Sequence, residues 1–478
     1  MNLKELFKDT NYDIDIKGIA SFSEDVEPGF LFITIPGNNY TGIEFINDVI
    51  KKGAACIVTS ENNNIYTSSI PIIYCKDEKI ELNRILNIFY QDIYNKVKLI
   101  GVTGTDGKTT ISTLTSFLLS EKYQTGLIGT NGIHCSFFDE ETHFTTPTLS
   151  KTYSTINKFL DYDISHVSME VSSEGILNNR IDNLSFDYAI FSNLSCEHLN
   201  THKTMHNYFN TKFKLFNQLK KGGTAIVNKD DNYSRFFDTI DNVIYYSLFL
   251  PSDYQAINIK YFDTYTTFDL ITPKGILRQL KINRTEEYNI YNVIPAIIIS
   301  LLENINISNI YSALLELPQI SGRMEKIPTS YPFDIYVDFA HTPNGIKNML
   351  LNIRKKTRRK LILVCGAAGA KDKIKRPEMG RYATEFADTV IFTSEDPRSE
   401  NPIDIVNDLT SNAFKKNYEV ILNRKSAIDK ALSIANKNDV VVISGKGKEN
   451  FFEENNIKYP YSDFEYVLNK KPVFNTQI

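Results

Sequence analysis

Apolar strands and amphipathic helices alternate along most of the chain. The apolar run from Leu99 to Val102 predicts a short buried strand, and the spacing of Ile111, Leu114 and Leu118 predicts a helix with one buried face directly after it. Strand and helix patterns of the same kind recur on both sides of this unit. The alternation predicts an α/β fold in which parallel strands are connected by helices.

Glycine and proline divide this pattern into three units. Residues 1–95 form a small α/β unit with no catalytic cluster of its own, for which we expect a packing role. Residues 96–325 form the largest unit, which closes near Gly322 and Pro328. Residues 326–478 contain four strands that each end in a polar cluster. Such clusters at the carboxyl ends of parallel strands form the binding crevice of an open α/β sheet.

Composition excludes several classes of protein. The 478 residues are 42% hydrophobic and 23% charged, with a net charge of −4, which is typical of a globular protein and gives no broad attraction to nucleic acid or membrane surfaces. The sequence has no signal-peptide core and no apolar run of membrane-spanning length. The five scattered cysteines form no CxxC pair and indicate reduced thiols. We therefore expect a cytoplasmic monomer whose partners are small molecules.

The turn between the first strand and helix of the central unit has the chemistry of a phosphate site. It contains Gly104, Thr105, Asp106 and Gly107, and the helix opens with Lys108, Thr109 and Thr110. Free backbone N–H groups and the helix dipole attract an anion, a lysine reaches the terminal phosphates, and a threonine hydroxyl can bind Mg²⁺. The usual pattern also has glycine at position 102, so an ordinary strand–turn–helix corner is the alternative. Because the flanking strand and helix both fit, we favour phosphate binding.

Three side chains beyond this loop are candidates for metal binding or catalysis. Glu170 ends an alternating strand, and a carboxylate one strand from a phosphate loop can hold Mg²⁺; a solvent-facing glutamate at a sheet edge is the alternative. His198 follows the next buried strand, although a lone histidine is more often structural. Lys212 lies at the edge of a helix face made of three phenylalanines. A buried lysine there must be paired or chemically changed, unless it extends past the rings to solvent.

A series of motifs runs in order along nearly the whole chain. They are GVTGTDGKTT, TTP at 145–147, MEVSS at 169–173, NLSCEHLNTHKTMHNYFNTKFKLF, GRME at 322–325, DFAHTP, KRPEMG, DPRSENP and GKGKE. This series resembles the Mur ligase family, in particular its UDP-muramyl-tripeptide synthetases. The resemblance implies an N-terminal UDP-sugar-binding domain (1–95), a central P-loop ATPase (96–325) and a C-terminal Rossmann-like domain that binds the amino acid (326–478).

The chemistry implied by this resemblance is ATP-dependent amide ligation in peptidoglycan synthesis. ATP would phosphorylate the carboxylate of UDP-MurNAc-L-Ala-D-Glu, and the amine of a third amino acid would attack the acyl phosphate. Phosphoryl transfer depends on positioning and charge neutralisation, so Mg²⁺ and cations are expected around it. One alternative is a paralogue that acts on a different carboxylate in a specialised pathway. The other is a catalytically silent ATP-binding subunit, which the joint presence of Lys108, Glu170, His198 and Lys212 argues against.

The resemblance also implies roles for single residues. ATP would contact Gly104, Thr105, Asp106, Gly107, Lys108, Thr109, Thr110, Asn289, Asn292, Arg323, Asp338 and His341. One Mg²⁺ would be held by Thr109 and Glu170, and a second by His198 and Lys212, with Lys212 as a carbamate made with CO₂. The acceptor would contact Ser23, Thr145, Thr146, Ser172 and Arg180. The incoming amino acid would contact Arg376, Asp396, Arg398, Gly445 and Glu449.

The motif expected to select the amino acid departs from the family's usual Asp-Asn-Pro-Arg. In the family, arginine at position 398 accompanies meso-diaminopimelate, and this side chain can hold a carboxylate bidentately. Asp396, in place of asparagine, would repel a carboxylate and attract an ammonium, which favours lysine. Lys448 beside Glu449 could offset part of that charge. We expect diaminopimelate, with lysine as the alternative.

Overall fold

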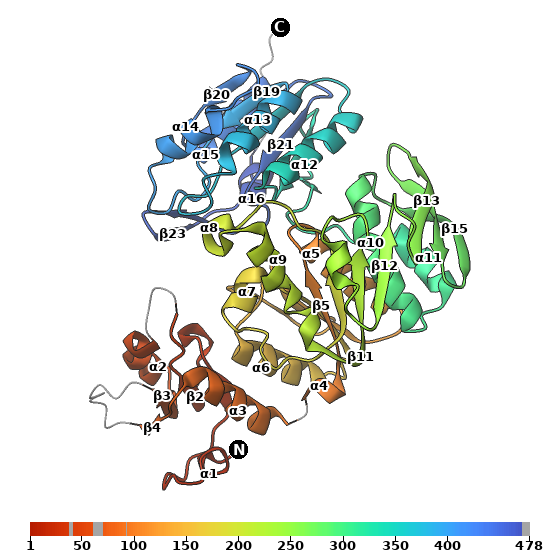
Figure 1. Ribbon diagram of the computed structural model, residues 1–478. Coiled ribbons are helices and arrows are strands. Elements are labelled where there is room, and N and C mark those ends of the chain that lie inside the picture. Colours follow the sequence, from red (N-terminus) through yellow and green to blue (C-terminus); the bar gives the residue numbers. More distant parts are fainter. Residues whose placement is uncertain (38–41, 61–69, 92, 471–478) are drawn as a thin grey trace.

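The computed structural model describes residues 1–37, 42–60, 70–91 and 93–470. Three α/β domains are stacked in chain order, from the N-terminal domain in red to the C-terminal domain in blue (Figure 1). This arrangement confirms the three-domain α/β fold expected from the sequence. No helix among the described residues is long and apolar enough to cross a membrane.

The N-terminal domain is built on a four-stranded parallel sheet in the order β1-β2-β3-β4. Its elements are α1 Leu3–Leu6, β1 Gly18–Ala20, β2 Phe30–Ile33, α2 Ile46–Lys51, β3 Cys56–Thr59, β4 Ile72–Tyr74, α3 Glu78–Tyr90 and α4 Ile93–Lys96. The chain turns between α2 and β3 at Gly53, whose φ of +90° suits glycine.

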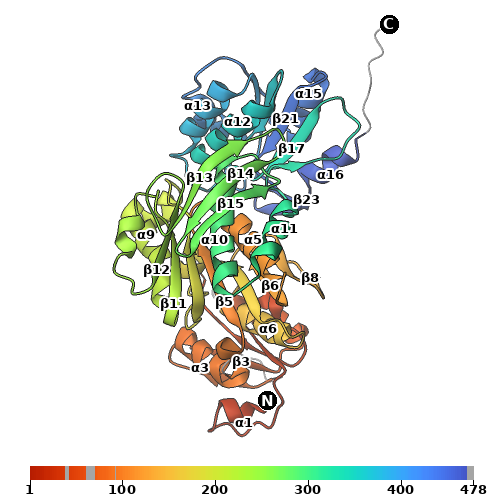
Figure 2. The ribbon, with the colours of Figure 1, turned by 90° about the vertical axis from the view of Figure 1, so that its right-hand side faces the viewer.

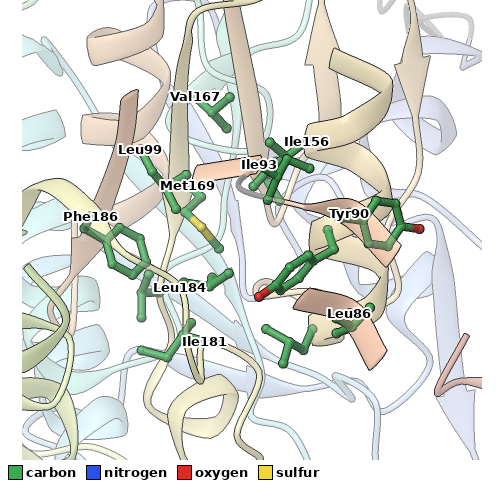
Figure 3. Close-up of a cluster of buried hydrophobic side chains, with 14 of the residues drawn as sticks. Leu86, Tyr90, Ile93, Leu99, Ile156, Val167, Met169, Ile181, Leu184 and Phe186 are labelled. Atoms are coloured by element: carbon green, nitrogen blue, oxygen red, sulfur yellow. The ribbon is translucent and has the colours of Figure 1, made fainter. Parts of the chain in front are cut away.

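An apolar core joins the N-terminal domain to the central one. Leu86 and Tyr90 of α3 belong to the same buried cluster as Ile156 of α6 (Leu149–Leu160), and Leu99 and Val167 of the central sheet belong to it too (Figure 3). Full burial of one such aliphatic or aromatic side chain contributes about 1.5–3 kcal/mol. The first domain is therefore fixed to the second by apolar packing.

The central domain contains an eleven-stranded sheet in the order β15-β14-β13-β12-β11-β10-β5-β9-β6-β7-β8. Its strands are β5 Lys98–Thr103, β6 Thr125–Gly129, β7 Gly132–Cys135, β8 Asp139–Glu140, β9 His166–Glu170, β10 Phe186–Phe191, β11 Leu219–Asn228, β12 Val243–Ser247, β13 Tyr254–Tyr261, β14 Thr266–Thr272 and β15 Gly275–Ile282. Its further helices are α5 Lys108–Leu119, α7 Ser173–Leu177, α8 Leu199–His202, α9 Met205–Phe213, α10 Glu287–Leu302 and α11 Ile307–Leu315.

Strand β5 lies in the parallel middle of this sheet, between β9 and β10. Residues of α5, α10 and α11 belong to the buried cluster on one face, and residues of α6 and α9 to the cluster on the other. Strands covered on both faces are apolar along their whole length, which explains the unbroken apolar run predicted for β5.

The end of the central sheet that contains β12 to β15 mixes parallel and antiparallel pairing. Strand β12 is parallel to β11, and β13 starts parallel to β12. The chain crosses back between β11 and β12 through the short 3-10 helix Ser234–Phe237, so these two strands run in the same direction. Within residues 243–282, only β13, β14 and β15 form an antiparallel meander.

The C-terminal domain has a six-stranded sheet in the order β16-β17-β21-β18-β19-β20, in which only β16 is antiparallel. Its elements are β16 Glu325–Lys326, β17 Asp334–Asp338, α12 Pro343–Lys356, β18 Leu361–Cys365, α13 Arg376–Phe386, β19 Thr389–Phe392, α14 Pro402–Thr410, β20 Tyr418–Val420, α15 Arg424–Ile434, β21 Val440–Ser444, the hairpin β22 Phe451–Glu454 and β23 Ile457–Pro460, and α16 Asp463–Leu468. It lies beyond the central domain, at the end of the stack away from the N-terminal domain (Figure 2).

Candidate active site between the central and C-terminal domains

A cavity of about 390 Å³, called here the central cavity, lies between the central and C-terminal domains. On the central side it is lined by Thr105, Asp106, Gly107, Lys108, Thr109, Thr130, His143, Phe144, Thr145, Glu170, Ser172, Ser173, Glu174, Arg180, Glu197, His198, Asn200, Tyr208, Lys212 and Arg323. On the C-terminal side it is lined by Phe339, His341, Ala368, Lys371, Asp372, Lys375, Glu395, Asp396, Arg398, Gly445 and Glu449. Most of these residues follow the carboxyl end of a parallel strand, where ligands bind in open α/β folds.

The phosphate loop, residues 104–110, connects β5 to α5. Gly104 has a φ of +147° and Gly107 a φ of +89°. A Cβ atom at Gly104 would lie 1.9 Å from Ser192 Oγ, and one at Gly107 would lie 2.6 Å from Asn292 Oδ1. Both positions therefore require glycine, for backbone conformation and for close approach.

A lysine, a threonine and a glutamate meet at this loop. Lys108 Nζ donates to the carbonyl oxygens of Gly104 at 3.0 Å and Thr105 at 2.7 Å. Thr109 Oγ1 donates to Glu170 Oε2 at 2.9 Å. Glu170 is only 1% exposed, at the end of an interior strand, so the alternative of a solvent-facing glutamate is wrong. A hydroxyl and a carboxylate side by side are the hard oxygen ligands that suit Mg²⁺.

Lys212 of α9 is buried at the same loop. Its side chain is 1% exposed, and Nζ donates to the Gly104 carbonyl oxygen at 2.7 Å, 4.5 Å from the centre of the Tyr208 ring. Burial, with a further contribution from the charge of Lys108, lowers the pKa of Lys212 well below its usual value. The alternative in which this lysine extends past phenylalanines to solvent is therefore wrong.

His198 lies beside Lys212, with a backbone φ of +56°. Burial lowers its pKa, and the charges of Lys212 and Lys108 lower it further, against the opposing effect of Glu197. A neutral imidazole keeps a free ring nitrogen for a metal or a proton. Among the described residues, no group of three or more His, Cys, Asp or Glu side chains is arranged to hold a metal. Metal binding at this end of the cavity would therefore depend on Thr109 and Lys212 as well.

Glu197 is a site residue that the sequence reasoning missed. Its Oε1 lies 2.9 Å from His341 Nε2 and 3.5 Å from Lys375 Nζ, both in the C-terminal domain. Burial opposes its ionisation, but His341, His198 and Lys375 together lower the pKa of Glu197 well below the usual value. Its position directly before His198 was the available signal. This ion-pair cluster connects the two domains across the cavity.

The residues expected to contact the acceptor lie in and behind the wall toward the N-terminal domain. Arg180 Nη1 donates to the carbonyl oxygen of Thr146 at 3.0 Å, and its guanidinium lies 3.9 Å from the centre of the Phe144 ring. Thr145, Ser172 and Arg180 line the central cavity. Thr146 is buried behind them, where its Oγ1 accepts from the Ser172 amide at 2.9 Å.

Ser23 lines a second pocket, of about 260 Å³, between the N-terminal and central domains. Phe144 and Arg180 line both this pocket and the central cavity, so the two spaces adjoin. A long ligand could thus extend from the N-terminal domain to the phosphate loop.

Several residues with an expected ATP contact do not line the cavity. Asn289 Nδ2 donates to Glu286 Oε2 at 2.8 Å, and Asn292 abuts Gly107 from α10. Asp338 accepts from the amides of Met324 at 2.7 Å and Ala340 at 2.8 Å, so it holds the connection between the domains. Thr110 is likewise buried on α5. Arg323, in contrast, lines the cavity and donates from Nη2 to Thr109 Oγ1 at 3.2 Å.

Arg376 is expected from the sequence to contact the amino acid, but it does not line the central cavity. Its fully buried guanidinium donates to both carboxylate oxygens of Glu400, each at 2.8 Å, to Asp408 Oδ2 at 2.9 Å and to the Ala368 carbonyl oxygen at 3.2 Å. Two carboxylates of the same domain therefore neutralise the charge of Arg376. Arg376 anchors the loop that carries Lys375, but its own side chain does not reach the cavity.

Four charged side chains form what is called here the acidic pocket: Glu395, Asp396, Lys446 and Glu449. The fully buried Lys446 Nζ lies 2.8 and 2.7 Å from the two Asp396 carboxylate oxygens and 2.9 Å from Glu449 Oε2. The expectation that Lys448 offsets this charge is wrong, because Lys448 Nζ donates to the Asn131 carbonyl oxygen at 3.0 Å. Lys446 was missed although it stands in the same short motif.

Arg398 lines the cavity beside the acidic pocket. It has a φ of +54°, and its Nε donates to Glu453 Oε2 at 3.1 Å while Nη1 donates to the Gly369 carbonyl oxygen at 2.9 Å. Within the described part of the chain, Nη2 makes no hydrogen bond. One guanidinium edge thus remains available for a carboxylate.

Comparisons with known proteins cover almost the whole chain. Residues 15–93 match the family "Mur ligase family, catalytic domain", residues 102–300 the "Mur ligase middle domain", and residues 322–447 the "Mur ligase, glutamate ligase domain". The chain is 34% identical to UDP-N-acetylmuramyl-tripeptide synthetase 2 of Oceanobacillus iheyensis (95% of this chain and 94% of that protein). It is 35% identical to the UDP-N-acetylmuramoyl-L-alanyl-D-glutamate–2,6-diaminopimelate ligase of Bacillus velezensis (96% of each).

Two solved structures illustrate the fold. A structure titled as a UDP-N-acetylmuramoyl-L-alanyl-D-glutamate–2,6-diaminopimelate ligase aligns with a TM-score of 0.61 at 26% identity, over 98% of both chains. The MurF ligase of Thermotoga maritima in complex with ADP aligns with a TM-score of 0.67 at 17% identity, over 89% of this chain and 93% of that one.

Proposed function

Because the chain belongs to the Mur ligase family, we propose that it is an ATP-dependent ligase that adds the third amino acid to UDP-MurNAc-L-Ala-D-Glu in peptidoglycan synthesis. The amino acid is meso-diaminopimelate, and the enzyme works in the cytoplasm as a monomer. The observation that carries the proposal is the convergence of Lys108, the Thr109–Glu170 pair and the buried Lys212 on one loop, opposite the loops of the C-terminal sheet.

The nucleotide triphosphate binds at the phosphate loop. Lys108 turns from the loop carbonyls to the terminal phosphates, where its charge follows the transferred group. Arg323 lies next to Thr109 and adds a second cation. Thr109 and Glu170 hold Mg²⁺, which neutralises charge on the phosphates when bound. Charge neutralisation and fixed positions are what phosphoryl transfer to a carboxylate requires.

Lys212 acts as a carbamate. Its lowered pKa supports this, because only a neutral amine can attack CO₂; the N–C bond forms and a proton leaves. The product is an anion at a site where a buried ammonium is costly. Together with His198 it offers ligands for a second Mg²⁺.

The acceptor occupies the space shared by the two pockets. Ser23 lies at its UDP-sugar end, and Thr145, Ser172 and Arg180 lie along its peptide end. The carboxylate to be activated then reaches the phosphate loop. The incoming amino acid enters from the C-terminal side, where Arg398 faces a distal carboxylate and Glu449 a distal ammonium.

Phosphate release tests the proposal. Purified protein with Mg-ATP, UDP-MurNAc-L-Ala-D-Glu and meso-diaminopimelate should release phosphate and form a tripeptide product detectable by mass. Omission of the acceptor or of the amino acid is the matched control, and each should stop product formation. No product with either diaminopimelate or lysine, from protein that binds ATP, would contradict the proposal and favour a different acceptor.

A further inference from the structure

The acidic pocket contains more carboxylates than cations. One ammonium, Lys446, serves both Asp396 and Glu449. Asp396 is almost fully buried, contacts Lys446 through both oxygens and also accepts from the Glu453 amide at 2.9 Å. Glu449 has one contact with Lys446, and 31% of its side chain remains exposed. The shared cation is therefore held mainly by Asp396.

This unequal sharing leaves negative charge on the cavity side. A single ammonium can neutralise one of two carboxylates, and Asp396 has the closer and more numerous contacts. Glu449 lines the central cavity and keeps the uncompensated charge. Glu395 stands next to it, and its Oε2 has no hydrogen-bond partner among the described residues and lies where Gly445 leaves room. A ligand with a cationic group would bind to this negatively charged side of the cavity.

We propose that Asp396 controls the affinity for the amino acid indirectly, because it holds the Lys446 ammonium away from Glu449 and so leaves Glu449 free to bind a distal ammonium. Asp396 is thus a positioning residue, because both of its carboxylate oxygens contact the Lys446 ammonium. The inference rests on the proposed function and specifies the substrate as an amino acid with a distal ammonium. Diaminopimelate satisfies both Glu449 and the free edge of Arg398, whereas lysine satisfies Glu449 alone.

The substitution Asp396→Asn tests this proposal. Asparagine keeps the shape but removes the charge, so Lys446 is left with Glu449 as its single carboxylate partner. The KM for diaminopimelate and for lysine should each rise roughly tenfold, the effect of about one charged contact. The kcat, the KM for ATP and the KM for the acceptor should stay within about twofold. Asp404→Asn, an exposed carboxylate on α14 of the same domain, is the control for loss of charge.

A substrate analogue separates this explanation from a structural effect. 2-Aminopimelate has the chain length and distal carboxylate of diaminopimelate but no distal ammonium. Its kcat/KM should be unchanged by Asp396→Asn. An equal loss for all three amino acids would mean that the substitution damages the pocket, and a gain for diaminopimelate would mean that Asp396 repels the ligand directly. Either result overturns the proposal.

A double substitution gives a second test. Glu449→Gln should raise the KM for lysine in the wild type, but in the Asp396→Asn background it should add little, because Lys446 already neutralises Glu449. Additive effects of the two substitutions would contradict the coupling. Wild-type protein that forms no tripeptide at all would instead overturn the proposed function, so the two failures are distinguishable.

Discussion

The phosphate loop and the acidic pocket lie at opposite sides of the same cavity and are built in different ways. At the phosphate loop, Lys108, Thr109 and Glu170 stand at the ends of regular elements in the middle of the sheet. In the acidic pocket, Asp396 has a φ of +40° and Gly445 a φ of +110°, and the loops after β19 and β21 contribute charges that contact one another.

This difference predicts how each side responds to change. A substitution at the phosphate loop removes one charge from a frame that hydrogen bonds within the sheet hold in place. A substitution at Asp396, Lys446 or Glu449 redistributes charge among the remaining partners, because Lys446 contacts both of the carboxylates. The first kind of change should act on the chemical step, and the second kind on amino-acid affinity.

The largest effect is expected from Lys108→Ala. Loss of the cation that follows the transferred phosphoryl group should lower the rate of ligation about 10³-fold or more. The melting temperature should hardly change, since Lys108 Nζ bonds to two carbonyl oxygens of its own loop and, among the described residues, to no other group. Phosphate release and a thermal melt measure the two quantities. Ligation at a near wild-type rate would show that this loop is not the catalytic phosphate site.

Lys212→Ala should follow, with a loss of about 10²- to 10³-fold in rate and with ATP binding largely retained. Formate or acetate should restore part of the activity if the lysine acts as a carbamate. Lys214→Ala, two residues along and exposed, is the matched control and should be neutral. Full activity of the Lys212 variant would contradict the role of this side chain.

Gly445→Ala tests the crowding of the acidic pocket. A Cβ atom there would lie 1.9 Å from Glu395 Oε2, at a φ that also strains any L-residue. The KM for the amino acid should rise about 10- to 100-fold, because the new methyl group would displace the Glu395 carboxylate and the backbone would be strained. Gly275→Ala has a φ of +129° but nothing within 4 Å, so it isolates the strain. If the two variants had equal KM values for the amino acid, crowding in the acidic pocket would not be the cause of the effect.

Arg398→Ala should have a smaller and selective effect. Removal of the guanidinium edge that faces a distal carboxylate should lower kcat/KM for diaminopimelate about tenfold. Lysine lacks that carboxylate and should lose less, so the ratio of the two kcat/KM values is the measurement. A wild-type preference for lysine that this substitution leaves unchanged would show that Asp396 and Glu449 alone set specificity.

Glu303 offers a contrast with both sides of the cavity, because it lies at the far end of the sheet. Although burial opposes its ionisation, hydrogen bonds from His166, Lys98 and Tyr188 lower its pKa to about 2. A carboxyl group with a lowered pKa stabilises the fold above its unfolded pKa of about 4.3, and this stabilisation is lost as the pH falls toward 2. Glu303→Gln should cost about 1–2 kcal/mol of unfolding free energy at pH 7 and little at pH 2.

Denaturant unfolding of wild type and of the Glu303 variant at several pH values measures this difference. Ligation by the variant should remain near the wild-type rate, because Glu303 is remote from the cavity. A pH-independent destabilisation would assign the effect to packing instead of charge.

Local features of the chain were open to prediction. The apolar run of β5, the glycines of the phosphate loop and the start of α5 follow from neighbouring residues, because period and backbone conformation are local properties. The predictions that Glu170 ends a strand and that Lys212 faces inward are confirmed in position, and their chemical roles stay predictions.

Pairing between distant charges was decided by the tertiary structure alone. Lys446 neutralises Asp396 from 50 residues away, and Glu197 meets His341 across the domain boundary. Arg376 contacts Glu400 and Asp408 and not the cavity. Each of these buried charges is compensated by an opposite charge that folding brings close to it. Which charge is nearest depends on how loops from separate strands are brought together, and the order of residues along the chain does not contain that information in any local pattern.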